Sequence, residues 1–257
     1  LVLVVLISFA GRGSPVTLEL SGGGWARLVD PAWSSVIVRS VVMAVATTGV
    51  CLLLGAPLAV HVARRPPRTR RVLYFAVLLP LWASSLALTY AWIVVLRSGG
   101  LADQAARALG AVAEGGTLGW LYTPGAVLLG LVYAYLPFMV HAVYASAERL
   151  DWGLVEAAED LGATRATALR RVVLPLLRPG LAAGCVLVFV PALGAFVVPD
   201  LLGGAKSAYL GNVLQDRFRM EPLDWPLGSA LAVTVLVAVG AAVVFLARRE
   251  RGLDALA

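Results

Sequence analysis

Residues 156–175, EAAEDLGATRATALRRVVLP, combine carboxylates, arginines and one glycine between two long apolar stretches. Charged side chains are costly inside lipid, so this segment is predicted to lie in water at the membrane surface. Its charges and its turn glycine would present a shaped surface to another molecule. We therefore interpret it as a docking element.

The spacing of residues in this segment predicts two short helices joined by a turn. Asp151 can cap the first helix, and Gly162 supplies the left-handed residue that ends it. Thr164 can cap a second helix that runs to Leu174, and Pro175 is predicted to disrupt its continuation. The expected result is a helix-turn-helix elbow over residues 151–174.

One face of the first helix is predicted to be apolar. Leu154, Ala158 and Leu161 share that face by the three-four spacing. Simpler roles remain open for two residues of the elbow: Glu156 as a solvated helix carboxylate and Gly162 as a helix C-cap only.

Histidine and cysteine offer little for catalysis or metal binding in this sequence. His61 and His141 are isolated, without a carboxylate or cysteine nearby, so neither indicates a metal site. Cys51 and Cys185 fall in apolar stretches, where cysteine acts as a small packing residue. His141 is interpreted as a polar contact between helices, with a role in a transport pathway as the alternative.

Other chemistries are excluded by missing patterns in the sequence. A membrane-embedded enzyme would need paired acids, a histidine cluster or a Ser/Lys dyad at membrane depth, and none has usable spacing. The sequence lacks a Gly-x-x-x-x-Gly-Lys-Ser/Thr loop, so it does not hold ATP in the usual way. The net charge of +6 is assigned to membrane topology and not to nucleic acid.

The docking element resembles a known motif. Glu156-Ala157-Ala158 is followed after three residues by Gly162 and after nine more by 172–175, VVLP. This is similar to the EAA loop of the permeases of binding-protein-dependent ABC importers, with Val172 where the family usually has isoleucine. In that family the loop forms a coupling helix that sits in a cleft of the cytoplasmic ATPase. The resemblance assigns ATPase coupling to Glu156, Ala157, Ala158, Gly162, Leu174 and Pro175.

Much of the remaining chain is similar to one branch of that family, the spermidine/putrescine-type permeases. The similar stretches are 80–92, 121–148, 190–204 and 224–229. This resemblance implies import of a polyamine or a related amine compound. Import of another solute, such as an opine-like compound, another amine or an anion, is the alternative. An ATP-independent channel or secondary transporter is more distant, because the docking loop would have no purpose there.

Two positions depart from the branch and weaken the polyamine interpretation. Leu88 stands where an arginine-like polar residue is expected, and Ala195 stands where a glutamate is expected. A buried carboxylate would be the natural partner of a cationic amine, because an unpaired charge inside a membrane is costly.

Polar and aromatic residues remain as candidates for the transport pathway. Trp92 would offer a cation–π face. Asp200 is either a pathway carboxylate or a solvated residue at the end of a span. The candidate set is Thr89, Tyr90, Trp92, Tyr135 and Asp200.

Composition predicts the elements that would position these residues. The chain has 257 residues, of which 60% are hydrophobic and 14% charged, whereas soluble domains average about 25% charged. We predict an all-α integral membrane protein in one domain, 1–257, and the resemblance implies that it has the type I permease fold of ABC importers. The predicted spans are 36–60, 72–96, 124–146, 180–200 and 227–247. Residues 1–10 are interpreted as the outer end of a truncated sixth span, with a signal-peptide core as the alternative.

Basic residues predict the orientation of these spans. Arginine is concentrated in 62–71, 147–179 and 248–257, which places these segments in the cytoplasm. The loops 97–122 and 201–226 are then external, and each contains an amphipathic stretch. The coupling loop, 147–179, therefore faces the cytoplasm.

The resemblance also implies partners and a location. A second permease, identical or homologous, would supply the other half of the pathway. Two ATPase subunits would bind ATP and Mg²⁺, so no cofactor is expected in this chain. An extracytoplasmic solute-binding protein would deliver the solute to the external loops. The expected location is the bacterial cytoplasmic membrane, as a multi-pass protein.

Overall fold

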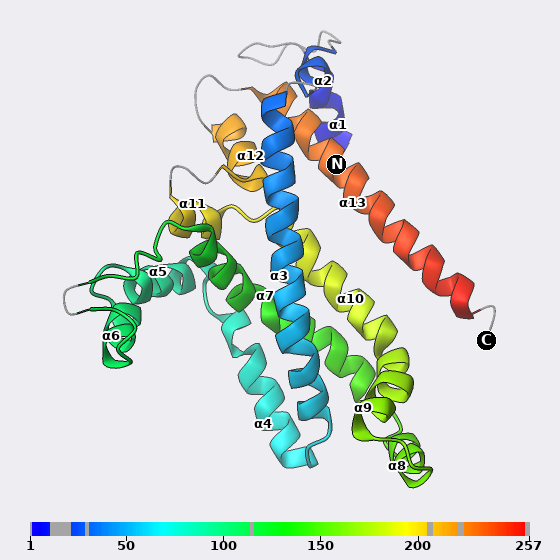
Figure 1. Ribbon diagram of the computed structural model, residues 1–257. Helices are drawn as coiled ribbons and strands as arrows, with labels where there is room; N and C mark the ends of the chain where they lie inside the picture. The colour runs from blue at the N-terminus through cyan, green and yellow to red at the C-terminus, as the bar shows by residue number, and fades with distance from the viewer. Residues whose placement is uncertain are drawn as a thin grey trace. The chain divides into compact units, whose positions relative to one another are not determined.

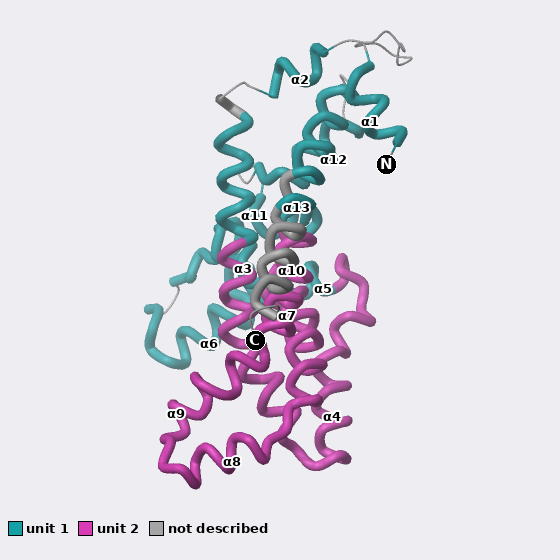
Figure 2. Tube along the Cα trace, turned by 90° about the vertical axis from the view of Figure 1, so that its right-hand side faces the viewer, with its two compact units in different colours: residues 1–44, 88–130, 193–257 teal, residues 45–87, 131–192 magenta. Residues whose placement is uncertain are grey.

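The computed structural model describes residues 2–10, 22–28, 31–113, 116–204, 208–219 and 224–254. Parts of the predicted loops 97–122, 201–226 and 248–257 therefore lie outside the described residues. The described residues form helices and turns, with no strand among them. They group into two compact units, each assembled from separate stretches of chain, as Figure 2 shows. The prediction of a single domain over 1–257 stays a prediction.

Unit 1 comprises residues 1–44, 88–130 and 193–257, and unit 2 comprises residues 45–87 and 131–192. Figure 1 labels the helices in chain order. Their bounds are α1 Val2–Ser8, α2 Gly23–Arg27, α3 Pro31–Ala63, α4 Pro67–Leu78, α5 Ser85–Leu96, α6 Leu101–Ala108, α7 Pro124–Ala147, α8 Gly153–Asp160, α9 Arg165–Ala168, α10 Leu174–Leu193, α11 Val197–Gly203, α12 Leu210–Arg219 and α13 Trp225–Asp254.

Four helical stretches are long and apolar enough to cross a membrane. They are Trp33–Ala63, Ser85–Ala108, Pro124–Ala147 and Arg165–Leu193. The first and third match the predicted spans 36–60 and 124–146, while 227–247 falls within α13. The all-helical membrane fold is confirmed. The count of six spans stays a prediction, and so does the interpretation of residues 1–10, of which Val2–Ser8 form α1.

The predicted span 72–96 is wrong as one continuous helix. Its first part belongs to α4, and a 3₁₀ turn over Leu79–Trp82 then leads to an extended Ala83 before α5 begins. Pro80 lies in that turn, where it lacks the N–H that an α-helix would use. By contrast, Pro57 and Pro137 remain inside α3 and α7. Proline position alone therefore does not tell where a helix ends.

The predicted span 180–200 and the expected break at Pro175 are also wrong. α9 continues into a π-helical segment, Leu169–Val173, and then into α10 without interruption. In a π segment each bond joins a carbonyl to the N–H five residues later instead of four. Such a local shift lets carbonyls near a proline bond to other N–H groups, so the helix can continue past Pro175. The helix ends instead at Leu193, and after a short turn the separate α11 covers Val197–Gly203.

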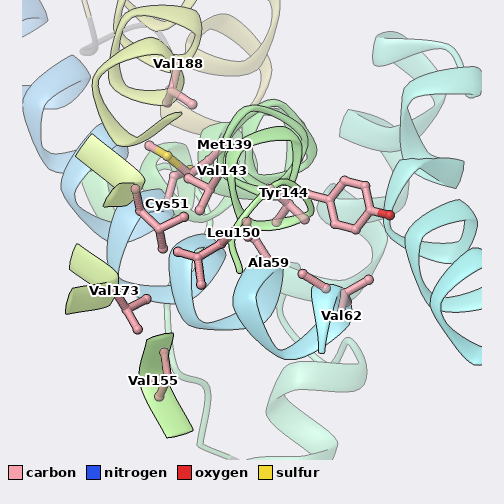
Figure 3. Close-up of a cluster of buried hydrophobic side chains, with 14 of the residues drawn as sticks. Cys51, Ala59, Val62, Met139, Val143, Tyr144, Leu150, Val155, Val173 and Val188 are labelled. Carbon is pink, nitrogen blue, oxygen red and sulfur yellow. The ribbon is translucent and has the colours of Figure 1, made fainter. Parts of the chain in front are cut away.

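Unit 2 has one contiguous apolar core, part of which Figure 3 shows. α7 contributes Met139, Val140 and Val143 to it, and α3 contributes Cys51 and other residues. Burial of Cys51 confirms its expected packing role, and Cys185 is packed against the same core. Small residues permit the close packing, because a Cβ at Gly55 or Gly184 would press on Met139.

Unit 1 is held together partly by polar contacts near the start of α13. α1 and α2 pack on α13. The Arg27 guanidinium pairs with the buried Asp224 carboxylate, with a second bond of 3.1 Å between Nη2 and Oδ1. The Arg217 guanidinium lies over the Trp33 ring, 5.4 Å from the ring centre, which is a cation–π distance. These contacts fix α2 and α12 to their neighbours.

Candidate functional site

The elbow, residues 151–174, is capped as its sequence predicts. The Asp151 carboxylate accepts the Gly153 N–H at 2.9 Å at the start of α8. Gly162 has a φ of +88°, and its N–H donates to the Glu159 carbonyl at 2.9 Å. The Thr164 hydroxyl accepts the Thr167 N–H at 3.3 Å, which caps α9. The two helix starts and the turn between them are therefore confirmed, although the second helix continues past Leu174.

The residues predicted to share an apolar face of α8 differ in exposure. Val155 is the buried residue of α8, whereas Leu154 is 50% exposed and Leu161 is 90% exposed. Ala158 is half-buried and packs against the core with Val155. The three-residue spacing of Val155 and Ala158 fits a buried helix face. The spacing of Leu154 and Leu161 fits one equally well, so spacing alone did not tell which pair is buried.

The outward surface of α8 is apolar and acidic. Leu154, Ala157 and Leu161 recur with a helical spacing and are exposed, with Glu156 exposed beside them. Leu154 and Leu161 thus leave apolar surface exposed at the elbow. Among the remaining coupling candidates, Leu174 is 42% exposed and Pro175 is half-buried.

The inward side of the elbow is continuous with the core of unit 2. Val155 from α8, Ala168 from α9 and Val173 from the π segment all belong to that core. Figure 3 shows Val155 and Val173 in the same cluster as Met139 of α7. The elbow and the long helices of unit 2 therefore share one packed core.

Two contacts of the elbow region were not predicted from the sequence. The Arg64 guanidinium lies 5.0 Å from the centre of the Trp152 ring at the start of α8. The Arg70 guanidinium forms an ion pair of 3.3 Å with the Glu148 carboxylate. Both join the 62–71 and 147–179 segments, which the sequence had placed on the same side of the membrane. The specific partners depend on tertiary packing, which local spacing does not reveal.

The candidate pathway residues are divided between the two units. In unit 1, Thr89 is buried, Tyr90 is 56% exposed and Trp92 is half-buried, all on α5. Asp200 is exposed in the first turn of α11, so it is not at the end of the preceding span. In unit 2, the Tyr135 hydroxyl donates to the Pro191 carbonyl at 3.2 Å. A shared pathway for these five residues stays a prediction.

His141 makes the polar contact between helices that its sequence context predicts. Its Nδ1 atom is hydrogen-bonded to the Tyr74 hydroxyl, which joins α7 to α4 in unit 2. The Tyr74 ring also stacks on Tyr144, with ring centres 4.3 Å apart. Within the described residues, no group of three His, Cys, Asp or Glu side chains is arranged to hold a metal ion.

Comparison with known protein families gives a match over most of the chain. A family model described as the inner membrane component of binding-protein-dependent transport systems matches residues 51–249. The spermidine/putrescine transport system permease PotB of Salmonella typhimurium strain LT2 is 38% identical over 254 residues, covering 98% of this chain and 88% of that protein. PotB of Haemophilus influenzae is 40% identical over 245 residues, covering 92% and 83% respectively.

Solved structures show the same fold. A chain of a bacterial alginate ABC transporter, in complex with its alginate pentasaccharide-bound periplasmic protein, aligns with a TM-score of 0.70 at 17% identity, over 91% of this chain and 84% of that one. A chain of the MetNI methionine ABC transporter aligns with a TM-score of 0.59 at 19% identity, over 90% and 97%. At these identities the likeness concerns the fold alone. Together with the family match, they establish that this chain belongs to the inner membrane components of binding-protein-dependent transport systems, the permease subunits of ABC importers.

Proposed function

We propose that this chain is the permease of an ATP-driven importer of spermidine, putrescine or a related amine. The observation that carries the proposal is the 38–40% identity to spermidine/putrescine permeases over more than nine tenths of the chain. The permease would work with a second permease, two ATPase subunits and an extracytoplasmic solute-binding protein. The alginate transporter structure, which includes its periplasmic protein, supports this kind of assembly.

The elbow is proposed as the coupling element. ATPase subunits would contact the exposed surface formed by Leu154, Glu156, Ala157 and Leu161. Their closure on ATP would move α8, and the buried Val155 would pass that movement into the core of unit 2. Burying a valine stabilises such a contact by roughly 1.5–3 kcal/mol, so α8 and the core would move together.

A non-polyamine cargo is the second candidate, and it rests on Ala195. The branch resemblance predicts a glutamate there, and alanine cannot neutralise an ammonium group. Permeases with similar sequences carry different names: the molybdenum transport permease ModB of Mycobacterium bovis is 30% identical over 233 residues. The family relationship therefore leaves the solute to be tested directly.

The test is ATP hydrolysis by the reconstituted complex with its own binding protein. Spermidine, putrescine and a non-amine solute would each be added at saturating concentration. We expect stimulation by a polyamine and none by the non-amine solute. Stimulation only by the non-amine solute would reject the polyamine cargo and retain the importer.

A further inference from the structure

The second helix of the elbow carries a hollow of about 450 Å³ that two arginines help to line. The hollow is lined by Ala166, Thr167, Arg170 and Arg171, and we call it the arginine hollow. Both arginines are exposed. Among the described residues, no carboxylate forms an ion pair with either of them. The site is therefore positively charged and open to an anionic group.

The position of the arginine hollow along the helix sets its depth in the membrane. The continuous helix that contains α10 ends at Leu193, and its last 20 residues, Leu174–Leu193, span about 30 Å. This equals the thickness of the hydrocarbon layer. Arg170 and Arg171 precede α10 by one turn, so they lie at the level of the phospholipid headgroups. Arg178 is exposed one turn further in, from where its side chain can reach the same level.

Exposed leucines lie on the same helix as the arginine hollow, one within its range and two after it. Leu169 is 49% exposed, Leu174 is 42% exposed and Leu176 is 48% exposed. A bound molecule with an anionic head and apolar chains would contact the arginines and these leucines together. A carboxylate of a soluble protein, or a free phosphate ion, would use only the arginines.

We infer that the arginine hollow binds the phosphate group of an anionic phospholipid of the cytoplasmic leaflet. Arginine pairs matched to phosphate oxygens make strong, charge-assisted hydrogen bonds. Basic pockets at the cytoplasmic ends of spanning helices are suited to such headgroups. The bound lipid would hold the start of the long α9–α10 helix at the membrane surface, next to the coupling elbow.

The experiment compares lipid retention by wild-type and variant permease. Each purified full-length chain is incubated with equal amounts of phosphatidylglycerol and phosphatidylcholine, and bound lipids are counted by native mass spectrometry. The test variant is the double substitution R170Q/R171Q. The matched control is R68Q/R71Q, because Arg68 and Arg71 are also exposed, lie on α4 and remove the same charge. Thermal unfolding of each variant checks that it is folded.

We expect R170Q/R171Q to retain phosphatidylglycerol roughly thirtyfold less well, from the loss of two basic contacts at a charged membrane surface. R68Q/R71Q should lose far less, and phosphatidylcholine binding should not change in either variant. Unchanged phosphatidylglycerol binding in R170Q/R171Q would overturn the inference. Equal losses in both double variants would do so as well, because they would indicate a general charge effect.

Two further measurements separate the lipid from other anions. If R170Q/R171Q lost binding of inorganic phosphate but retained phosphatidylglycerol at the wild-type level, the arginine hollow would be assigned to free phosphate and the lipid rejected. If R170Q/R171Q kept its lipid but no longer bound the purified ATPase, the arginines would belong to the ATPase interface. Lipid retention is measured without cargo, so its outcome is independent of the test for polyamine transport.

Discussion

Two turns between helices in this chain have similar lengths but are held in different ways. The turn from α8 to α9 centres on Gly162, whose φ is +88°, and the Thr164 side chain caps the helix that follows. In the turn from α10 to α11, residues 194–196, no residue has a positive φ, and no side chain caps the new helix.

The second turn is held by α12, which comes later in the chain. The Asn212 amide donates to the Phe196 carbonyl at 3.1 Å, and Gly211 packs tightly against the turn. A Cβ at Gly211 would lie 2.4 Å from the Ala195 carbonyl oxygen and 2.6 Å from that of Gly194. The first turn is therefore encoded by its own residues, and the second by tertiary contacts.

The largest effect is expected at the locally encoded turn. Gly162→Pro is incompatible with a φ of +88°, because the proline ring fixes φ near −65°. A mismatch of this kind costs about 3 kcal/mol or more, and the elbow would rearrange. We expect the variant to insert into the membrane at the normal level, but ATP hydrolysis should no longer drive spermidine uptake in proteoliposomes.

The control at the same position is Gly162→Asn. Asparagine tolerates the left-handed conformation better than other non-glycine residues, so uptake should be largely retained. Wild-type uptake by Gly162→Pro would show that the shape of the elbow is not needed for coupling.

This contrast explains which features the sequence predicted. The caps at Asp151 and Thr164 and the turn at Gly162 depend on neighbouring residues, and all three were predicted correctly. The spacing of the apolar residues of α8 did not tell which of them is buried, because Val155 and Leu154 differ by one position and only packing against the core distinguishes them. The end of α10 at Leu193 was missed for the same reason, because α12 supports the turn that follows.

The next effect is expected at the turn held by tertiary contacts. Gly211→Ala would force a methyl group against two backbone carbonyls, and overpacking of this kind costs about 1–3 kcal/mol. Thermal unfolding in detergent should show a lower midpoint for the whole protein. The control is Gly49→Ala in α3, where a Cβ would meet no atom within 4 Å, and the midpoint should not fall. Equal midpoints for the two variants would mean that α12 does not support the turn.

The smallest effect is expected from removal of a single cap. Thr164→Ala deletes the hydroxyl that accepts the Thr167 N–H, and loss of such a cap costs about 1 kcal/mol. Because this turn is local, we expect the elbow to open more often while the thermal midpoint of the protein stays the same. Trypsin should then cleave after Arg165 or Arg170 about fivefold faster, since cleavage follows the population of the open form. Thr164→Ser keeps the hydroxyl and should be cleaved at the wild-type rate. A lower midpoint without faster cleavage would instead show that the elbow unfolds only with the rest of the protein.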